Sequence, residues 1–349
     1  MKVAFLVVGK EMPSTRFRVL QYLPFLEAKG ARWRIFFYQQ ALSLTALKKP
    51  RRLLRYIRAL GSGLTHDLVF LQKPGFVVHR WIYLRLLFAL GRRVIFDFDD
   101  AIFIDRLGGG PQPRAMMKKL EYILRRSRVV IAGNPVLAEY AGAFNPRVEI
   151  IPTPVDCERY SPAPNRPEAQ PLTIGWMGTA ANLGYMARLR PVISRILMET
   201  GARFLIVSDH FQKPSGLDLN FGPRIEFRRW QESRELDDLR QFDIGLMPLD
   251  DDPYTRGKCG YKLLLCMAVA VPVVASPVGI NSRIVEEGIN GFLAATEEEW
   301  LDKLLRLCHD GNLRRRMGAA NREKVIREYS LPAAAREWIA LLERTAAER

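Results

Sequence analysis

The sequence is poor in the residues that hold metal ions and disulfide bonds. Its 349 residues include four cysteines and four histidines. The cysteines are widely spaced and form no Cys-x-x-Cys pair, and no histidine lies at finger-like spacing from them. We therefore expect a reduced protein of the cytoplasm without structural zinc.

The sequence also lacks a hydrophobic run that is typical of a signal peptide or a membrane-spanning helix. The apolar residues 3–8 end at Gly9-Lys10-Glu11, and no small-residue cleavage site follows them. The uncharged residues 263–280 contain Pro272 and Pro277, and their second half is β-branched. We interpret the first stretch as a buried strand, and the second as a buried helix that runs into a buried strand.

Positive charge is abundant but unevenly distributed. The chain carries 53 Lys and Arg against 37 Asp and Glu, and the excess lies in residues 1–165, with 27 against 12. Six cations alternate with apolar residues at helical spacing: Lys48, Lys49, Arg51, Arg52, Arg55 and Arg58. This amphipathic helix is either a solvated helix with one face in the core or a patch that rests on an anionic membrane. The sequence has no signature for reading bases, so we do not expect nucleic acid as a partner.

Short apolar runs alternate with helical patterns along the whole chain, which is typical of parallel sheets covered on both faces. With 48% hydrophobic residues, the chain is long enough for two cores. We predict twelve strands, in residues 3–8, 34–38, 68–71, 94–98, 129–132, 149–151, 172–177, 203–207, 225–227, 244–247, 271–275 and 291–294. The expected fold class is α/β, with two tandem Rossmann-like, doubly wound domains.

A proline-rich stretch after Pro152 separates the two series of strands. It predicts an N-terminal domain in residues 1–165 and a C-terminal domain in residues 166–325. We expect residues 326–349 to form a helix that packs back on the N-terminal domain. Ligands bind at the carboxyl ends of the strands in such folds, so we expect a central cleft between the two sheets to hold the site.

The strongest local signal is a charged, glycine-containing loop before the helix predicted over residues 263–270. It contains Lys258, Gly260, Tyr261 and Lys262. Unpaired backbone N–H groups and the positive end of the helix dipole favour a diphosphate, and the two lysines add charge. The alternative is that the glycines only shape a turn and the lysines are solvated.

The order of several motifs resembles the donor half of the family-4 GT-B glycosyltransferases. The resemblance rests on residues 243–249, on Lys258 and Lys262, and on residues 272–279 and 286–291; upstream it includes residues 151–156 and 174–179. It implies a retaining transferase that uses a nucleotide sugar as substrate, needs no metal or cofactor, and binds its donor near Gly178 and Thr179. Basic side chains and backbone dipoles would then neutralise the leaving diphosphate.

The sequence departs from the pattern of this family in two respects. Many members carry two glutamates eight positions apart, one near the transferred sugar and one on the donor ribose, and the corresponding residues here are Gly257 and Leu265. The usual Arg and Lys pair after Gly178 is also absent. Lys258 and Lys262 would supply the missing charge.

Asp97, Asp99 and Asp100 end the strand predicted over residues 94–98. Carboxylates at such spacing repel one another, which favours a functional role. The resemblance places Asp99 or Asp100 beside the sugar and acceptor as the catalytic residue, with Asp97 structural. The rival interpretation is a metal-dependent transferase in which Asp97 and Asp99 hold a divalent cation.

Three further residues are candidates for binding. Arg16 and Arg18 follow the first strand and would bind a phosphate of the donor or of a lipid-linked acceptor, although such arginines are often solvated. Trp230 would stack on the nucleobase, or lie in the core.

The predicted function is the transfer of a sugar from a nucleotide sugar to a glycan or lipid-linked acceptor, in the cytoplasm or on the inner face of the membrane. The basic first half favours an anionic or membrane-held acceptor. A nucleotide-sugar epimerase of GT-B shape and a non-catalytic nucleic-acid or membrane binding protein remain as alternatives.

Overall fold

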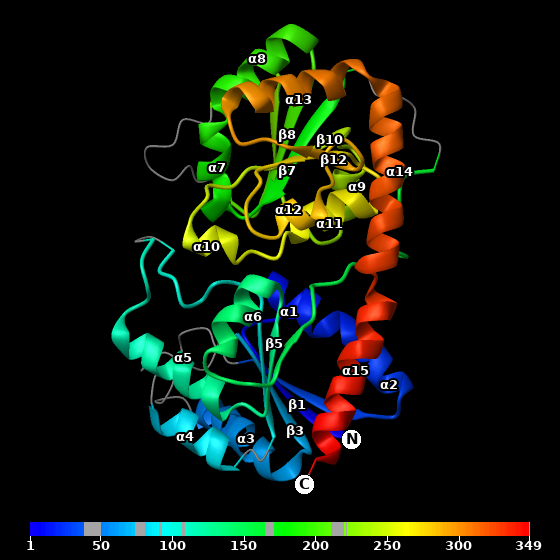
Figure 1. Ribbon diagram of the computed structural model, residues 1–349. Coiled ribbons are helices and arrows are strands. Elements are labelled where there is room, and N and C mark those ends of the chain that lie inside the picture. Colours follow the sequence, from blue (N-terminus) through cyan, green and yellow to red (C-terminus); the bar gives the residue numbers. More distant parts are fainter. Residues whose placement is uncertain are drawn as a thin grey trace. The chain divides into compact units, whose positions relative to one another are not determined.

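The computed structural model describes residues 1–37, 50–73, 81–90, 93–106, 109–164, 171–210, 220 and 222–348. The chain forms two compact units (Figure 1). The first consists of Met1–Pro154, Asp252–Cys259 and Leu331–Arg349, and the second of Val155–Asp251 and Gly260–Ser330. The change from the first unit to the second therefore comes before the proline-rich stretch ends, and the short segment Asp252–Cys259 belongs to the first unit.

The first unit contains a sheet of six parallel strands. They are β1 (Lys2–Val7), β2 (Arg32–Phe37), β3 (Leu68–Gln72), β4 (Val94–Phe98), β5 (Val129–Ala132) and β6 (Val148–Ile150). Their order is β2-β1-β3-β4-β5-β6. All residues of β3, β4 and β5 are buried, and all of them except Gln72 and Asp97 are apolar, as expected for strands covered on both faces. The direction of winding reverses between β1 and β3, so the carboxyl ends of these strands flank a topological switch point.

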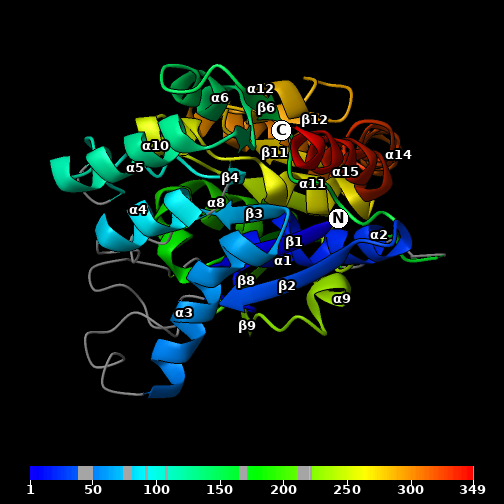
Figure 2. The ribbon, with the colours of Figure 1, turned by 90° about the horizontal axis from the view of Figure 1, so that it is seen from below.

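Helices cover both faces of this sheet (Figure 2). One face packs on α2 (Leu23–Ala28), which follows the short helix α1 (Pro13–Arg18), and on α15 (Leu331–Ala347). The other face packs on α3 (Pro50–Thr65), α4 (Trp81–Leu90), α5 (Arg114–Arg126) and α6 (Pro135–Gly142). Trp338 of α15 stacks on Tyr22 with ring centres 4.6 Å apart. The last helix is thus part of the first unit's core.

The second unit repeats the architecture with a different strand order. Its strands are β7 (Thr173–Gly178), β8 (Arg203–Ser208), β9 (Ile225–Arg229), β10 (Ile244–Met247), β11 (Val273–Ala275) and β12 (Gly291–Leu293), in the order β12-β11-β10-β7-β8-β9. All pairings are parallel. The winding reverses between β7 and β10, which is the switch point of this sheet.

Two helical layers enclose the second sheet. One contains α7 (Leu183–Arg188), α8 (Arg190–Thr200) and α13 (Glu297–His309), and the other α9 (Glu235–Leu239), α11 (Tyr261–Ala268) and α14 (Gly311–Glu328). Shorter elements are η1 (Leu20–Tyr22) and α10 (Pro253–Arg256) in the first unit, and η3 (Ala180–Asn182) and α12 (Asn281–Ile284) in the second. Two Rossmann-like α/β units confirm the predicted fold class.

The uncharged residues 263–280 form most of α11, the buried strand β11 and the turn after it, as the two prolines indicated. Within the described ranges, none of the helices has the length and apolar character needed to span a bilayer.

Candidate functional site

The switch point of the second sheet brings Lys262 against the end of β7. Its ammonium nitrogen lies 4.8 Å from the centre of the Trp176 ring, an attractive cation–π contact. A β-carbon built on Gly178 would lie 2.5 Å from the same nitrogen. Gly178 therefore leaves the space that the lysine side chain occupies at the carboxyl end of the strand.

The loop before α11 turns sharply at Gly260. Its φ is +64°, a conformation that side chains disfavour, and a β-carbon there would lie 2.5 Å from Ile284. Tyr261 is the first residue of α11, and Gly260 is its N-cap without a side-chain cap. Lys262 thus belongs to the first turn of a helix whose positive dipole end faces this loop.

Two other predicted donor residues lie on loops of the second unit. Thr179 is exposed directly after β7, and its hydroxyl accepts a hydrogen bond from Asn182 (2.8 Å). Asp209, after β8, accepts from the backbone N–H of Ala180 (2.7 Å) and so fixes the same loop. Trp230 follows the edge strand β9 and is half-buried against the core.

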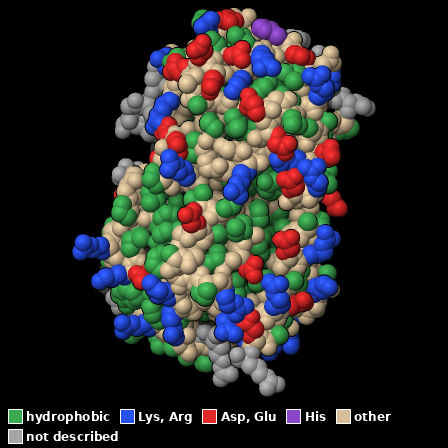
Figure 3. All heavy atoms as spheres, viewed as in Figure 1, with side chains coloured by type: hydrophobic (Ala, Val, Ile, Leu, Met, Phe, Trp, Pro, Cys, Tyr) green, Lys and Arg blue, Asp and Glu red, His purple; other side chains and the backbone are tan. Residues whose placement is uncertain are grey.

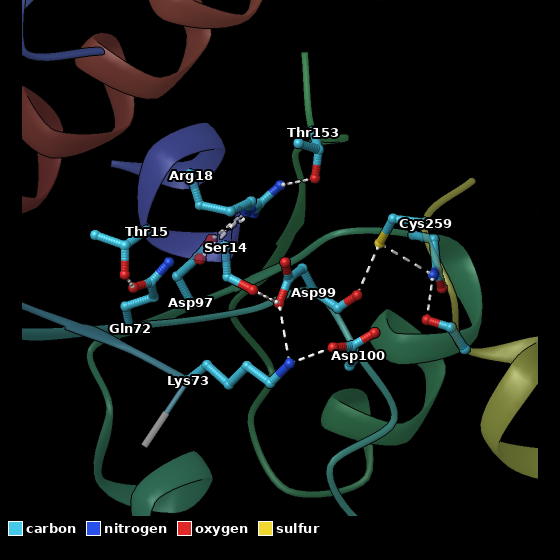
Figure 4. Close-up of polar contacts among 12 residues, drawn as sticks. Ser14, Thr15, Arg18, Gln72, Lys73, Asp97, Asp99, Asp100, Thr153 and Cys259 are labelled. Atoms are coloured by element: carbon cyan, nitrogen blue, oxygen red, sulfur yellow. Dashed lines mark hydrogen bonds and ion pairs between the residues drawn. The ribbon is translucent and has the colours of Figure 1, made fainter. Parts of the chain in front are cut away.

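The predicted carboxylate cluster of the first unit divides into a buried and an accessible part (Figure 4). Asp97 is 1% exposed and forms an ion pair with Arg18, which is 2% exposed. The Arg18 guanidinium also donates to the carbonyl oxygen of Ile151 (2.6 Å) and to the hydroxyl of Thr153 (3.4 Å). The prediction that Arg18 binds phosphate conflicts with this arrangement, because its nitrogens already donate to protein groups. Asp97, which was expected to be structural, is the ion-pair partner of this buried guanidinium.

Arg16 is also buried, with 7% of its surface exposed, and its guanidinium carbon lies 4.7 Å from the centre of the Phe17 ring.

Asp99 and Asp100 form the accessible part of the cluster, together with two residues from neighbouring segments. Lys73, directly after β3, forms an ion pair with Asp100, and its ammonium nitrogen lies 3.6 Å from Asp99 Oδ1. Ser14 of α1 donates to the same Asp99 oxygen (3.2 Å). The first sheet thus gathers a serine, a lysine and two carboxylates at the ends of adjacent strands.

The segment Asp252–Cys259 is attached to the first unit by specific contacts. The side-chain amide of Asn134, the N-cap of α6, donates to the carbonyl oxygens of Gly257 (2.9 Å) and Lys258 (3.2 Å). The Cys259 thiol donates to the carbonyl oxygen of Asp99 (3.1 Å), and burial raises the pKa of this thiol. A β-carbon on Gly133 would lie 2.4 Å from the Cys259 sulfur, so the close approach requires glycine.

Lys258 and Lys262 therefore have different surroundings. Lys258 precedes α11, and its ammonium lies 5.7 Å from the centre of the Tyr254 ring in the first unit. Burial lowers its pKa to about 8, although Asp100 opposes the shift. Since Lys258 lies outside α11, the two lysines do not share a helix face.

The predicted basic helix is only partly within the described residues. Lys48 and Lys49 lie outside them, and Arg51, Arg52 and Arg55 belong to α3, whose first side chains are not described. Arg58 is exposed, as are Ile57 and Leu64 of the same helix.

Three residues of these clusters were missed by sequence reasoning: Lys73, Asn134 and Trp176. The Asn134-Pro135 pair is a typical helix start and could have identified the cap. No local pattern distinguishes Lys73, because its partners lie in α1 and after β4. Within the described part of the chain, no group of three or more His, Cys, Asp or Glu is arranged to hold a metal ion.

Comparisons with known proteins agree with this architecture. Residues 171–310 match the family model "Glycosyl transferases group 1". No curated protein matches the chain.

Solved structures are similar over nearly the whole chain. Sucrose-phosphate synthase from Thermosynechococcus elongatus has a TM-score of 0.76 and 16% identity, with 99% of each chain covered. HepE from Anabaena, in complex with UDP and glucose, has a TM-score of 0.74 and 14% identity, with 98% of this chain and 99% of that chain covered. A glycosyltransferase from Rickettsia africae has a TM-score of 0.73 and 15% identity, with 100% and 99% covered.

At these identities the structures show the fold, and the family match concerns the second unit. Residues 171–310 are thus similar to the group 1 glycosyltransferases, and the chain as a whole has the two-domain fold of the solved glycosyltransferases.

Proposed function

We propose that this glycosyltransferase moves a sugar from a nucleotide-sugar donor to a glycan or lipid-linked acceptor. The second unit binds the donor, and the first unit binds the acceptor. The observation that carries the proposal is the ammonium of Lys262 at the switch point of the second sheet, held on Trp176 where Gly178 leaves space. HepE, which this chain resembles in fold, has been solved with UDP and with UDP-glucose.

The chemistry of the step explains why a cation is needed there. The bond between the anomeric carbon of the sugar and the phosphate oxygen breaks, and the nucleoside diphosphate leaves with additional negative charge. Lys262 and the N-terminal end of α11 stabilise that charge. The anomeric carbon bonds to the oxygen of the acceptor hydroxyl, whose proton passes to the leaving diphosphate. We propose that the transfer proceeds without a metal ion and with retention of configuration. The pairing of Asp97 with Arg18 and of Asp100 with Lys73 supports metal independence, because these carboxylates are already neutralised.

The accessible carboxylates of the first unit suit an acceptor. Asp99 is 16% and Asp100 29% exposed at the side chain, so a hydroxyl group can reach them. We propose that one of them accepts a hydrogen bond from the acceptor hydroxyl and orients it for transfer. An epimerase would instead require an acid and a base on the two sides of one sugar carbon.

The test is the thermal stability of the protein with a panel of nucleoside diphosphates and nucleotide sugars, with magnesium and with a chelator. One nucleotide should raise the midpoint without magnesium, by several degrees at saturation. Lys262→Met should abolish the shift, whereas Lys29→Met, which removes an exposed lysine after α2, should retain it. Absence of a shift with every nucleotide would contradict a donor site, and a shift only with magnesium would favour the metal-dependent alternative.

The surface of α3 and α4 favours a peripheral position on an anionic membrane. Ile57 and Leu64 of α3 are 57% and 71% exposed, and Ile82 of α4 is 59% exposed. Lys and Arg side chains lie among apolar ones on the part of the first unit that includes α4 and α5 (Figure 3). Exposed aliphatic residues beside cations are typical of surfaces that lie in the headgroup region.

Cosedimentation with vesicles tests this surface. The protein should bind vesicles that contain phosphatidylglycerol and not those of phosphatidylcholine alone, and high salt should weaken the binding. Ile57→Ser/Leu64→Ser should reduce binding severalfold, whereas Met198→Ser, which changes a 76% exposed residue of the second unit, should not. Equal binding by the double variant would remove α3 from the membrane surface.

A further inference from the structure

The switch point of the first sheet contains a lysine whose environment differs from that of an ordinary surface lysine. Lys73 follows β3 directly, and Ser14 belongs to the helix after β1, so both lie at the carboxyl side of the strands where the winding reverses. Ligands of doubly wound sheets bind at this place. Asp99 and Asp100, after the adjacent strand β4, complete the group.

Lys73 contacts both carboxylates at once. Its ammonium forms an ion pair with Asp100 and lies 3.6 Å from Asp99 Oδ1 (Figure 4). Burial opposes the charge on Lys73, but the two carboxylates outweigh it and raise its pKa. The lysine is therefore charged throughout the physiological range, and it offsets the repulsion between two neighbouring anions.

The backbone fixes the position of this lysine as well. Its φ is +20°, and within the described ranges Lys73 and Ala270 are the non-glycine residues with positive φ. The Lys73 N–H donates to the carbonyl oxygen of Asp97 in β4 (2.6 Å). The main chain of Lys73 is therefore fixed to the strand that precedes Asp99 and Asp100, which places the start of the lysine side chain beside the two carboxylates.

The neighbouring Arg18–Asp97 pair shows what a purely structural ion pair looks like in the same sheet. Its two side chains are 2% and 1% exposed, and the arginine also binds backbone and hydroxyl oxygens. Lys73, Asp99 and Asp100 are instead 23%, 16% and 29% exposed. The group of Lys73, Asp99 and Asp100 is thus accessible to a ligand, whereas the Arg18–Asp97 pair of the same sheet is enclosed by protein.

We propose that Lys73 is a positioning residue of the acceptor site, which holds the carboxylates of Asp99 and Asp100 in the orientation in which they accept hydrogen bonds from the hydroxyl groups of a sugar acceptor. This inference rests on the proposed function, because it assigns Asp99 and Asp100 to the acceptor. The Ser14 hydroxyl donates to the same Asp99 oxygen, Oδ1 (3.2 Å), from the helix that follows β1. Substrate hydroxyls then meet two acceptors of defined geometry.

The first experiment compares Lys73→Met, Lys73→Arg and the control Lys29→Met. Release of UDP from UDP-glucose is measured with methyl glucoside as the acceptor, and binding of UDP is measured by calorimetry. Lys73→Met should lower kcat about tenfold or more and leave the Kd of UDP unchanged, because orientation is lost but the donor site is not. Lys73→Arg should recover most of the rate, since a guanidinium restores the charge. A Lys73→Met variant with the wild-type rate would overturn the proposal.

A second measurement decides the proposal without turnover. Carbodiimide labelling of Asp99 and Asp100, followed by mass spectrometry, should be severalfold faster in Lys73→Met than in the wild type and close to the wild type in Lys73→Arg. Equal labelling in all three proteins would show that the lysine does not hold the carboxylates. If the wild type neither binds UDP nor releases it, UDP-glucose is not the donor, while the labelling still reports on Lys73.

Discussion

Removing the carboxylate of Asp97 should destabilise the first unit strongly, because it leaves the Arg18 charge buried without its partner. Both side chains are almost fully enclosed, at 1% and 2% exposure. Breaking a buried ion pair from one side typically costs about 3–5 kcal/mol. We expect Asp97→Ala to lie in this range, since Arg18 keeps only the Ile151 carbonyl and the Thr153 hydroxyl as partners.

The double variant Arg18→Met/Asp97→Leu separates the cost of an unpaired charge from that of lost packing. It removes both charges and fills the space with apolar atoms, which is often neutral for a buried pair. The Ile151 carbonyl then loses its donor, which costs roughly 1–3 kcal/mol. The double variant should therefore be more stable than Asp97→Ala alone.

Native-state hydrogen exchange is the suitable measurement for a chain of two units, because it reports the free energy of unfolding of each unit separately. Peptides from β3 and β5 report on the sheet around Asp97, and peptides from β8 in the second unit serve as an internal reference. Glu139→Ala, which changes an exposed carboxylate of α6, is the control and should change stability by about 0.5 kcal/mol or less. A loss below about 1 kcal/mol in Asp97→Ala, or a double variant less stable than the single one, would refute the reasoning.

Three further substitutions test other parts of the fold. Trp338→Ala should destabilise the first unit by about 3–5 kcal/mol, seen as faster exchange in β1 and β3, because the 1% exposed ring stacks on Tyr22. Ala270→Gly should stabilise the second unit by roughly 0.5–1 kcal/mol in urea unfolding, since φ is +60° at this alanine; a loss of stability would contradict this. Lys258→Met should stabilise the protein at pH 7 by about 1–2 kcal/mol, less than the full shift implies because the side chain is half-buried. The pKa of Lys258 is about 8 in the folded state and lies below its unfolded value, so the folded state binds fewer protons than the unfolded state between these two pKa values. The stability of the wild type therefore rises with pH in this range, and its melting temperature should approach that of Lys258→Met as pH rises from 8 to 10.

The fold was predictable because strands buried on both faces require continuous apolar sequence. β4, β5 and β10 have the predicted bounds, and the other strands differ from prediction by a few residues at their ends. Strand ends are less certain, because hydrogen bonding there depends on the partner strand, which the sequence does not identify. The order of strands, and with it the two switch points, arises from tertiary packing.

The candidate site was less predictable because its contacts join distant segments. Lys258 and Lys262 are four residues apart, and the sequence suggested that they face one anion. The left-handed turn at Gly260 starts α11 only at Tyr261, and Asn134 binds the backbone of Lys258 from a helix more than a hundred residues away. A short segment can therefore belong to the first unit even though its motif resembles a donor loop.

The residues that correspond to the two glutamates of the resembling family, Gly257 and Leu265, are closely packed in this chain. A β-carbon on Gly257 would lie 2.6 Å from the Ala101 side chain and 3.2 Å from Leu137, so no larger residue fits there. Leu265 is a residue of α11 that is 5% exposed and lies in the core of the second unit. A glutamate at either place would be buried without a partner rather than presented to a sugar nucleotide. The glutamates that the resemblance would place here are thus incompatible with the packing of this chain, and the proposed donor site has to use other residues.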